Sequence, residues 1–130
     1  PQMDSLDSQI LQFDSTALVF VEGIIKKYGW LGKNHIGKVA NRTLFLVIQH
    51  APNNETRKLY FPLLESSAKN GESELSAMAA MKDRILVQDG EFQIYGTQSR
   101  MVNGKLKSFP IEDSRNVNKR RKKVGLSKMK

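Results

Sequence analysis

The chain has 130 residues, of which 39% are hydrophobic and 26% are charged; this describes one globular domain and excludes a wholly disordered chain. It has no cysteine, so disulfides and thiolate chemistry are excluded, and no run approaches the roughly 20 apolar residues of a membrane helix. Residues 115–130 hold eight of the 21 Lys and Arg and no acid. The remaining 13 basic and 13 acidic residues balance, so the net charge of +8 belongs to this C-terminal segment.

The first predicted element is a long helix. Apolar residues recur every three or four positions from Met3 to Tyr28, which indicates one amphipathic helix over about residues 3–28. A shorter helix that begins near residue 15, with Asp14 or Ser15 as its cap, is the alternative. Gly29 is suited to end the helix in either case.

A glycine-rich connector with one aromatic anchor, Trp30, leads to the second element. Residues 39–51 contain neither Gly nor Pro, and Pro52 follows them. A stretch of this length favours a helix over a buried strand. Because the stretch is apolar on nearly every side, we expect this helix at the centre of the core.

The third predicted helix begins at Asn53 or Asn54, carries Glu55 in its first turn and ends at Gly71. Pro62 lies within it and should kink or divide the helix near Phe61. Its expected apolar face consists of Leu59, Tyr60, Leu63, Leu64 and Ala68.

Ser73 is expected to cap a fourth helix that reaches Gly90. Asn103-Gly104 then separates two short β-prone segments, which is a strong signal for a hairpin near residues 92–111. A final basic helix, capped by Asp113 or Ser114, should stop at Gly125. The sequence therefore predicts a mainly α (α+β) single domain of about five helices with one late β-hairpin. Residues 1–114 form its body, and residues 115–130 form a basic C-terminal helix or tail.

Three groups of polar residues lie among apolar neighbours. Gln49 and His50 lie at the end of the apolar segment "LFLVIQHA", and Asp83-Arg84 interrupts the apolar segment "AMAAMKDRILV". The third group is "QIYGTQ", in which a bulge at Gly96 would let Tyr95 and Gln98 converge. A buried imidazole or amide without partners costs about 1–3 kcal/mol, so we expect these groups to find one another.

The functional hypothesis is a pocket for a small polar ligand or a peptide, with hydrolysis as an extension. His50 would be the general base and Asp83 would orient it. Arg84 would hold an anionic group, and Trp30 would form an apolar wall. The expected site comprises the catalytic pair His50 and Asp83 and the ligand-binding residues Trp30, Gln49, Arg84, Tyr95 and Gln98.

Two alternatives stay open. The same polar residues could form a purely structural network that joins the hairpin to the helices. Residues 115–130 could instead form the functional binding surface, for nucleic acid or for an anionic membrane surface. We expect no metal or other cofactor, because His35 and His50 lack carboxylates at ligand spacing and no phosphate-binding glycine loop is present.

Five segments, in this order, resemble a bacterial protein family of unknown function: "KYGWLGK", "LFLVIQHA", "DRILV", "QIYGTQ" and "PIEDSRNVNKRRKKVGL". The resemblance covers about residues 25–126, and members carry Trp-Gly, Gln-His-Ala, Asp-Arg and Tyr-Gly-Thr-Gln segments. It implies that these segments belong together but supplies no reaction or ligand. Related chains often continue past the position of Lys130, and some begin with a secretion signal. We therefore expect a shortened C-terminus, and a removed signal would agree with Pro1 in place of methionine. The compartment and the oligomeric state stay open.

Overall fold

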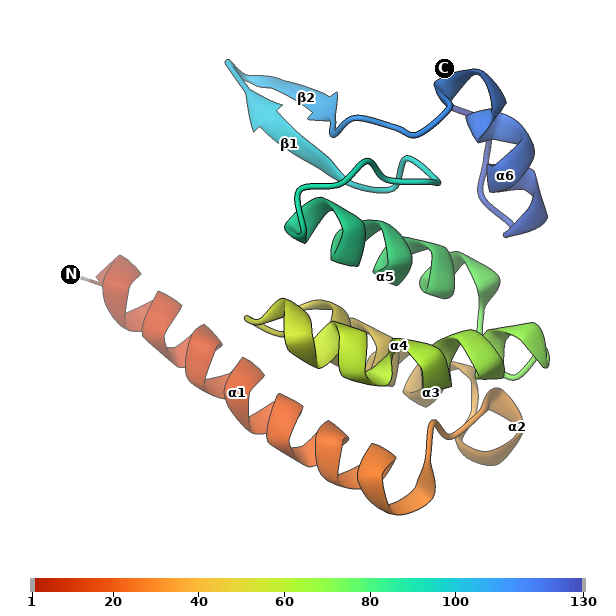
Figure 1. Cartoon of the computed structure of the whole chain (residues 1–130). Coiled ribbons are helices and arrows are strands. Elements are labelled where there is room, and N and C mark those ends of the chain that lie inside the picture. Colours follow the sequence, from red (N-terminus) through yellow and green to blue (C-terminus); the bar gives the residue numbers. More distant parts are fainter. Residues whose placement is uncertain (1, 130) are drawn as a thin grey trace.

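A computed structural model describes the backbone of residues 2–129 and the side chains of residues 15–129. These residues confirm the mainly helical domain with one late hairpin (Figure 1). Helices α3, α4 and α5 pack against one another, and α1 covers α3. Helix α5 lies between the other helices of this group and the layer formed by the hairpin and α6. The elements are α1 (Gln2–Tyr28), α2 (Lys33–Ile36), α3 (Lys38–Gln49), α4 (Asn54–Lys69), α5 (Leu75–Gln88), β1 (Ser99–Val102), β2 (Lys105–Ser108), a 3₁₀ turn (Ser114–Asn116) and α6 (Val117–Lys123).

Helix α1 is the single long helix, and the alternative start near residue 15 is wrong. It ends where expected, at Gly29, which has φ +78° and donates its N–H to the carbonyl of Ile25. Val21 and Ile25 are buried on the face that meets the core. The apolar positions from Met3 to Phe13 lie outside the residues whose side chains the structure describes.

Helix α3 confirms the helix predicted over residues 39–51, but not its expected burial on nearly every side. Leu44, Phe45 and Ile48 are buried, whereas Val39 is 81% exposed. Its first three residues, 38–40, are all exposed. The helix is therefore amphipathic and packs through one face.

Helix α4 begins as predicted, because Asn53 Oδ1 accepts hydrogen bonds from the N–H groups of Glu55 and Thr56. The expected division at Pro62 is wrong, since one helix runs through this position, and the kink expected as the other outcome stays a prediction. Tyr60 and Leu64 are buried on either side of the proline, and their packing holds both halves against the core. Two of the expected apolar-face residues, Leu59 and Leu63, are instead exposed.

The cap expected at Ser73 is also wrong. Glu74 is the residue that precedes α5, and Ser73 is buried because its hydroxyl takes part in a hydrogen-bonded chain described below. The hairpin turns at Asn103-Gly104, which have φ values of +51° and +77°, as the predicted type of tight turn requires. None of the helices in the described part of the chain is long and apolar enough to cross a membrane.

Candidate functional site

The loop between α1 and α2 is fixed by a chain of buried side-chain hydrogen bonds. Asn41 of α3, which is buried, donates from Nδ2 to the carbonyl of Leu31 and to Ser73 Oγ, both at 2.9 Å. Ser73 Oγ is also hydrogen-bonded to Ser67 Oγ of α4 at 2.7 Å. Because α3, α4 and the turn before α5 all contribute to this chain, the position of the neighbouring Trp30 is set by the core.

Glu72, in the turn after α4, closes the other side of the same loop. Its carbonyl accepts the N–H of Lys33 at 2.8 Å, and its carboxylate accepts Asn34 Nδ2 at 2.6 Å. Gly32 allows this approach, since a Cβ built there would come within 2.3 Å of Glu72 Oε2. The backbone of Gly32 has φ −86°, so the glycine is required by space and not by conformation.

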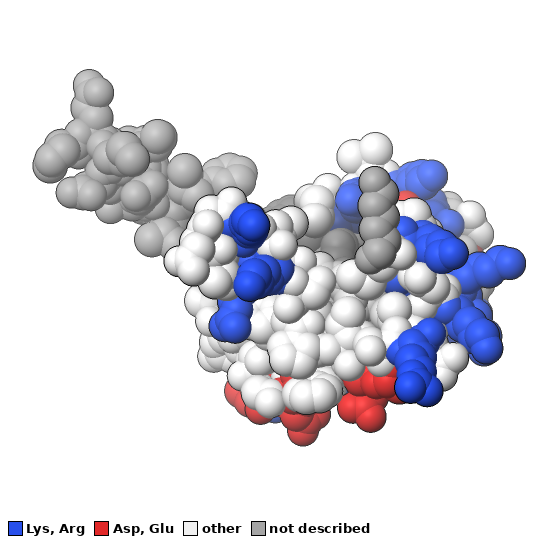
Figure 2. Space-filling view, turned by 90° about the horizontal axis from the view of Figure 1, so that it is seen from above, with Lys and Arg blue, Asp and Glu red and all other residues white. Residues whose placement is uncertain are grey.

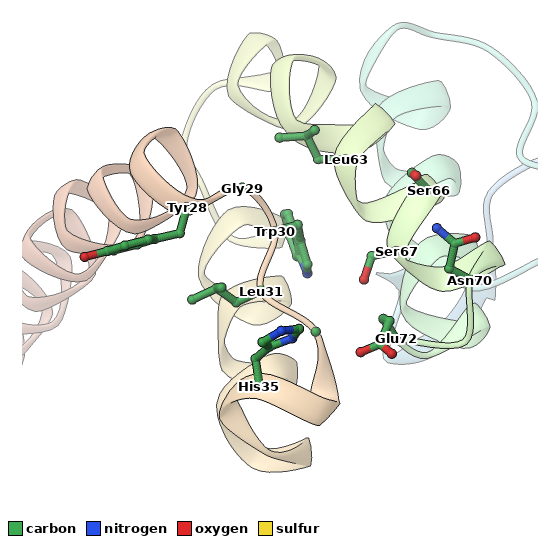
Figure 3. A pocket seen from close by; sticks show the side chains of 11 residues that line it. Tyr28, Gly29, Trp30, Leu31, His35, Leu63, Ser66, Ser67, Asn70 and Glu72 are labelled. Atoms are coloured by element: carbon green, nitrogen blue, oxygen red, sulfur yellow. The ribbon is translucent and has the colours of Figure 1, made fainter.

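These contacts frame a cleft of about 420 Å³, which we call the Trp30 cleft (Figure 3). The Trp30 side chain projects into it from the loop, facing residues of α4 and the following turn. Its indole Nε1 is buried and has no hydrogen-bond partner among the side chains and backbone that the structure describes. Apolar lining comes from Trp30, Leu31 and Leu63, and polar lining from His35, Ser66, Asn70 and Glu72.

The predicted site residue Asp83 is fully buried and holds the segment that follows α5. Its carboxylate accepts the N–H groups of Ile94 at 2.8 Å, Tyr95 at 3.0 Å and Thr97 at 3.0 Å, and the Thr97 hydroxyl at 2.8 Å. Gln98 joins the same group by donating from Nε2 to Thr97 Oγ1. The structure thus brings Asp83, Tyr95 and Gln98 together, around backbone amides.

Two arginines of α6 hold the carbonyl side of this segment. Arg121 Nη1 donates to the carbonyl of Tyr95 at 2.7 Å, and Arg120 Nε donates to the carbonyl of Ile94 at 2.8 Å. Arg120 also binds the carbonyls of Glu112 and Asp113. Burial and the Asp83 charge raise the pKa of Tyr95, although the nearby Arg120 charge lowers it. The half-buried Tyr95 ring and the fixed backbone make this segment part of the framework.

Gln49 and Arg84 lie in another part of the structure, where α3 meets α5. Gln49 is buried and donates from Nε2 to the carbonyl of Ala80, one turn before Arg84. Gln49 Oε1 and Arg84 Nε are both buried and have no hydrogen-bond partner in the described structure. Arg57 of α4 is 1% exposed and binds the carbonyls of Gln49 at 3.1 Å and Ala51 at 2.6 Å. Burial, followed by the Arg84 charge, lowers the pKa of Arg57.

His50 is exposed at the end of α3, and its Nδ1 lies 2.8 Å from the carbonyl of Leu46 in its own helix. Among the side chains of residues 15–129, no hydrogen bond joins His50 to Asp83, whose oxygens are occupied by the segment 94–97. The expected single pocket therefore separates into three places: the Trp30 cleft, the α3–α5 contact and the Asp83 segment. Catalysis by His50 and Asp83 stays a prediction that this geometry does not favour.

Sequence reasoning missed Glu72, Asn41 and Arg57. Arg57 has the sequence context of a surface charge in a helix, and only the fold shows that it caps α3. One feature of the sequence could have indicated Glu72. It directly follows Gly71, at the end of a predicted helix, where a residue can contact another segment of the chain. Its partner loop lies about 40 residues away, so spacing alone could not pair them.

The basic C-terminal segment has two kinds of cation. Arg120 and Arg121 are committed to backbone carbonyls, whereas Lys119, Lys122 and Lys128 line a surface cavity with Leu126. Figure 2 shows Lys and Arg side chains gathered on the side of the molecule that carries α6. In the described part of the chain, these three lysines take part in no salt bridge.

A protein-family model described as a family of unknown function (DUF6624) matches residues 2–130. Neither the curated proteins nor the solved structures contain a match to the chain. The fold and the Trp30 cleft are therefore the basis for any functional conclusion.

Proposed function

Because this chain belongs to DUF6624, a family whose function is unknown, we propose from its geometry that it binds a small polar ligand or a short peptide in the Trp30 cleft. The observation that carries the proposal is that Trp30, whose buried indole Nε1 has no hydrogen-bond partner among the described residues, lines a 420 Å³ cleft. Ligand pockets commonly enclose about 300–1,000 Å³ and combine apolar walls with a few polar groups. The cleft has both features.

The unused hydrogen-bonding groups define what such a ligand needs. An N–H that is buried without a partner costs about 1–3 kcal/mol, and a ligand acceptor beside Trp30 would recover part of this. Across the cleft, the side chains of Ser66 and Asn70 make no hydrogen bond within the described residues. A ligand with a carbonyl at one end and a polar donor at the other, as in an amide, matches this arrangement.

The chain's single tryptophan makes the proposal directly testable. In a ¹⁵N–¹H spectrum of the full chain, the indole group of Trp30 gives one resonance, which can be followed during titration with N-acetylglycinamide and n-butylamine. We expect saturable shifts of this resonance and of the amides of residues 29–35 and 66–72. If neither compound shifts them at millimolar concentration, binding at the cleft is refuted.

Trp30→Phe removes the indole N–H and keeps an aromatic ring as the apolar wall, so it tests the contribution of the N–H alone. This variant should remain folded, because the phenylalanine ring fills most of the space of the indole ring. Since the variant has no indole resonance, binding is followed through the amide resonance of Gly32. We expect affinity for N-acetylglycinamide to fall about 5–10-fold, the usual value of one hydrogen bond. Tyr28→Phe, which alters an exposed residue at the cleft rim, is the matched control and should bind as the parent protein does.

A second candidate function is binding of a polyanion, either nucleic acid or an anionic membrane surface, through Lys119, Lys122 and Lys128. It is favoured by the position of all three around one surface cavity without acidic partners. Removal of residues 115–130 would not test it cleanly, because Arg120 and Arg121 hold the segment after α5. Lys119→Gln with Lys122→Gln is the sharper variant, since both side chains are exposed and free of hydrogen bonds in the described structure.

For this second candidate we expect a single-stranded DNA oligonucleotide, or vesicles that contain phosphatidylglycerol, to bind with an affinity that falls steeply as salt rises. The double lysine variant should reduce the slope of log affinity against log salt by about 1–2. Binding that is unchanged by both salt and the variant would exclude the lysine surface as the site.

A further inference from the structure

The Trp30 cleft differs in charge from the protein that surrounds it. The chain has a net charge of +8, yet no Lys or Arg lines this cleft. Among the residues whose side chains are described, Glu72 is the single acidic one that lines the cleft. A local negative charge within a positively charged molecule attracts the cations that the rest of the surface repels.

Within the described part of the chain, Glu72 also has no cationic partner of its own. Its neighbours in sequence, Glu65 and Glu74, each have one: Glu65 lies 3.9 Å from Lys69, and Glu74 lies 3.9 Å from Arg42. The described hydrogen-bond donors to the Glu72 carboxylate both belong to the neutral residue Asn34, at 2.6 and 3.4 Å. A carboxylate has about four acceptor positions, so capacity remains on Glu72.

The other walls of the cleft suit a compact ammonium group. The Trp30 ring stands across the cavity from Glu72, so an alkyl chain whose ammonium lies beside Glu72 would extend toward this apolar wall (Figure 3). An ammonium carries three donors, of which Glu72 can take one or two. The side-chain oxygens of Ser66 and Asn70, on the same side of the cavity as Glu72, can accept the remainder.

We propose that the Trp30 cleft selects ligands that carry a primary alkylammonium group, with the ammonium beside Glu72 and the alkyl part against Trp30 and Leu63. This inference rests on the proposed function, since it names the ligand class of the same site. A free small amine and the side chain of a lysine share this chemistry. The experiment includes one probe for each.

Three probes of equal chain length isolate the charge: n-butylammonium, butanamide and butyrate. Dissociation constants are measured with the full chain through the Trp30 indole resonance. We expect n-butylammonium to bind about 10-fold or more tightly than butanamide, and butyrate not to bind, as charge-assisted hydrogen bonds predict. If Nα-acetyl-lysine amide binds more tightly than n-butylammonium, the ammonium group that the cleft selects is that of a lysine in a peptide. If n-butylammonium binds more tightly, it is that of a free amine.

Glu72→Gln is the decisive variant, because a glutamine oxygen can still accept from Asn34 while the charge is lost. Affinity for n-butylammonium should fall about 10-fold and affinity for butanamide should stay the same. Glu55→Gln, at the far end of α4, removes an equal charge outside the cleft and should change neither. An unaltered Lys33 amide resonance in Glu72→Gln verifies that the loop contact with Glu72 is intact.

The outcomes separate this inference from the proposed function. If butanamide binds as tightly as n-butylammonium in the parent protein, ammonium selection is wrong but binding at the cleft stands. The same holds if Glu72→Gln leaves the ammonium affinity unchanged. If no probe shifts the Trp30 resonance, both proposals fail.

Discussion

Asp83 and Arg121 bind the two backbone polar groups of one residue, Tyr95: its N–H donates to Asp83 Oδ1 at 3.0 Å, and its carbonyl accepts from Arg121 Nη1 at 2.7 Å. Helices α5 and α6 are thus joined through a segment that has no regular secondary structure of its own. This relationship gives structural roles to two charges that sequence patterns assign to catalysis and to a basic tail.

Asp83→Asn should destabilise the fold, because one of the two carboxylate oxygens becomes an NH₂ group that faces backbone N–H donors. We expect the free energy of unfolding to fall by about 2–4 kcal/mol, from hydrogen bonds lost to a charged acceptor. Urea denaturation measures this, with Glu91→Gln, an exposed acid, as the control. A catalytic Asp83 with no structural role would instead leave the midpoint unchanged.

Arg121→Ala and Lys123→Ala form a matched pair on α6. Arg121 binds the carbonyls of Tyr95, Gly96 and Ser127, whereas Lys123 is exposed. We expect the arginine variant to lose about 1–3 kcal/mol of unfolding free energy and the lysine variant less than about 0.5 kcal/mol. Equal losses, measured by thermal and urea unfolding, would show that the arginine is merely a solvated tail charge.

Arg57→Leu should remove the cap at the end of α3. The carbonyls of Gln49 and Ala51 would then be buried without their donor, which predicts a loss of about 2–4 kcal/mol. Arg42→Leu changes an exposed arginine whose salt bridge with Glu74 is solvated, so its effect should stay below about 1 kcal/mol. Similar urea midpoints for the two variants would contradict the assigned role of Arg57.

Tyr60 predicts how stability depends on pH at the alkaline end. Burial, helped by the hydrogen bond to Glu22, raises the pKa of Tyr60 to about 12. Since the folded state favours the protonated phenol, this contribution is complete below the usual tyrosine pKa of about 10. It is then lost as the pH rises from about 10 to about 12. The difference in unfolding free energy between the parent protein and Tyr60→Phe should therefore shrink across this range, and a constant difference would contradict the shift.

A structural feature could be predicted from the sequence where residues close by in the chain determine it. Asn53 as a helix cap and Asn103-Gly104 as a hairpin turn act on their immediate neighbours, so the helices and the hairpin were predicted with few errors. Ser73 has the sequence context of a cap, but buried partners from α3 and α4 decide its role. Patterns within one segment do not contain such partners.

The candidate site shows the same limit more strongly. Trp30 lines a cleft beside His35 and Glu72, and none of the other residues predicted to share its pocket lines that cleft. The polar residues around His50 were grouped because they interrupt apolar segments. Interruption shows only that a polar group is held within a core; it does not say whether backbone, side chain or ligand is the partner. For Asp83 the partner is backbone.

The measurement that tests the account most directly compares the two histidines of the chain. His35 lines the Trp30 cleft and His50 ends α3 elsewhere, so His35→Ala and His50→Ala distinguish the two possible sites. With n-butylammonium as the probe, we expect amide shifts confined to residues 29–35 and 66–72, an altered dissociation constant for His35→Ala and an unchanged one for His50→Ala. Shifts centred on Gln49, His50 and Arg84, with binding lost only in His50→Ala, would contradict it.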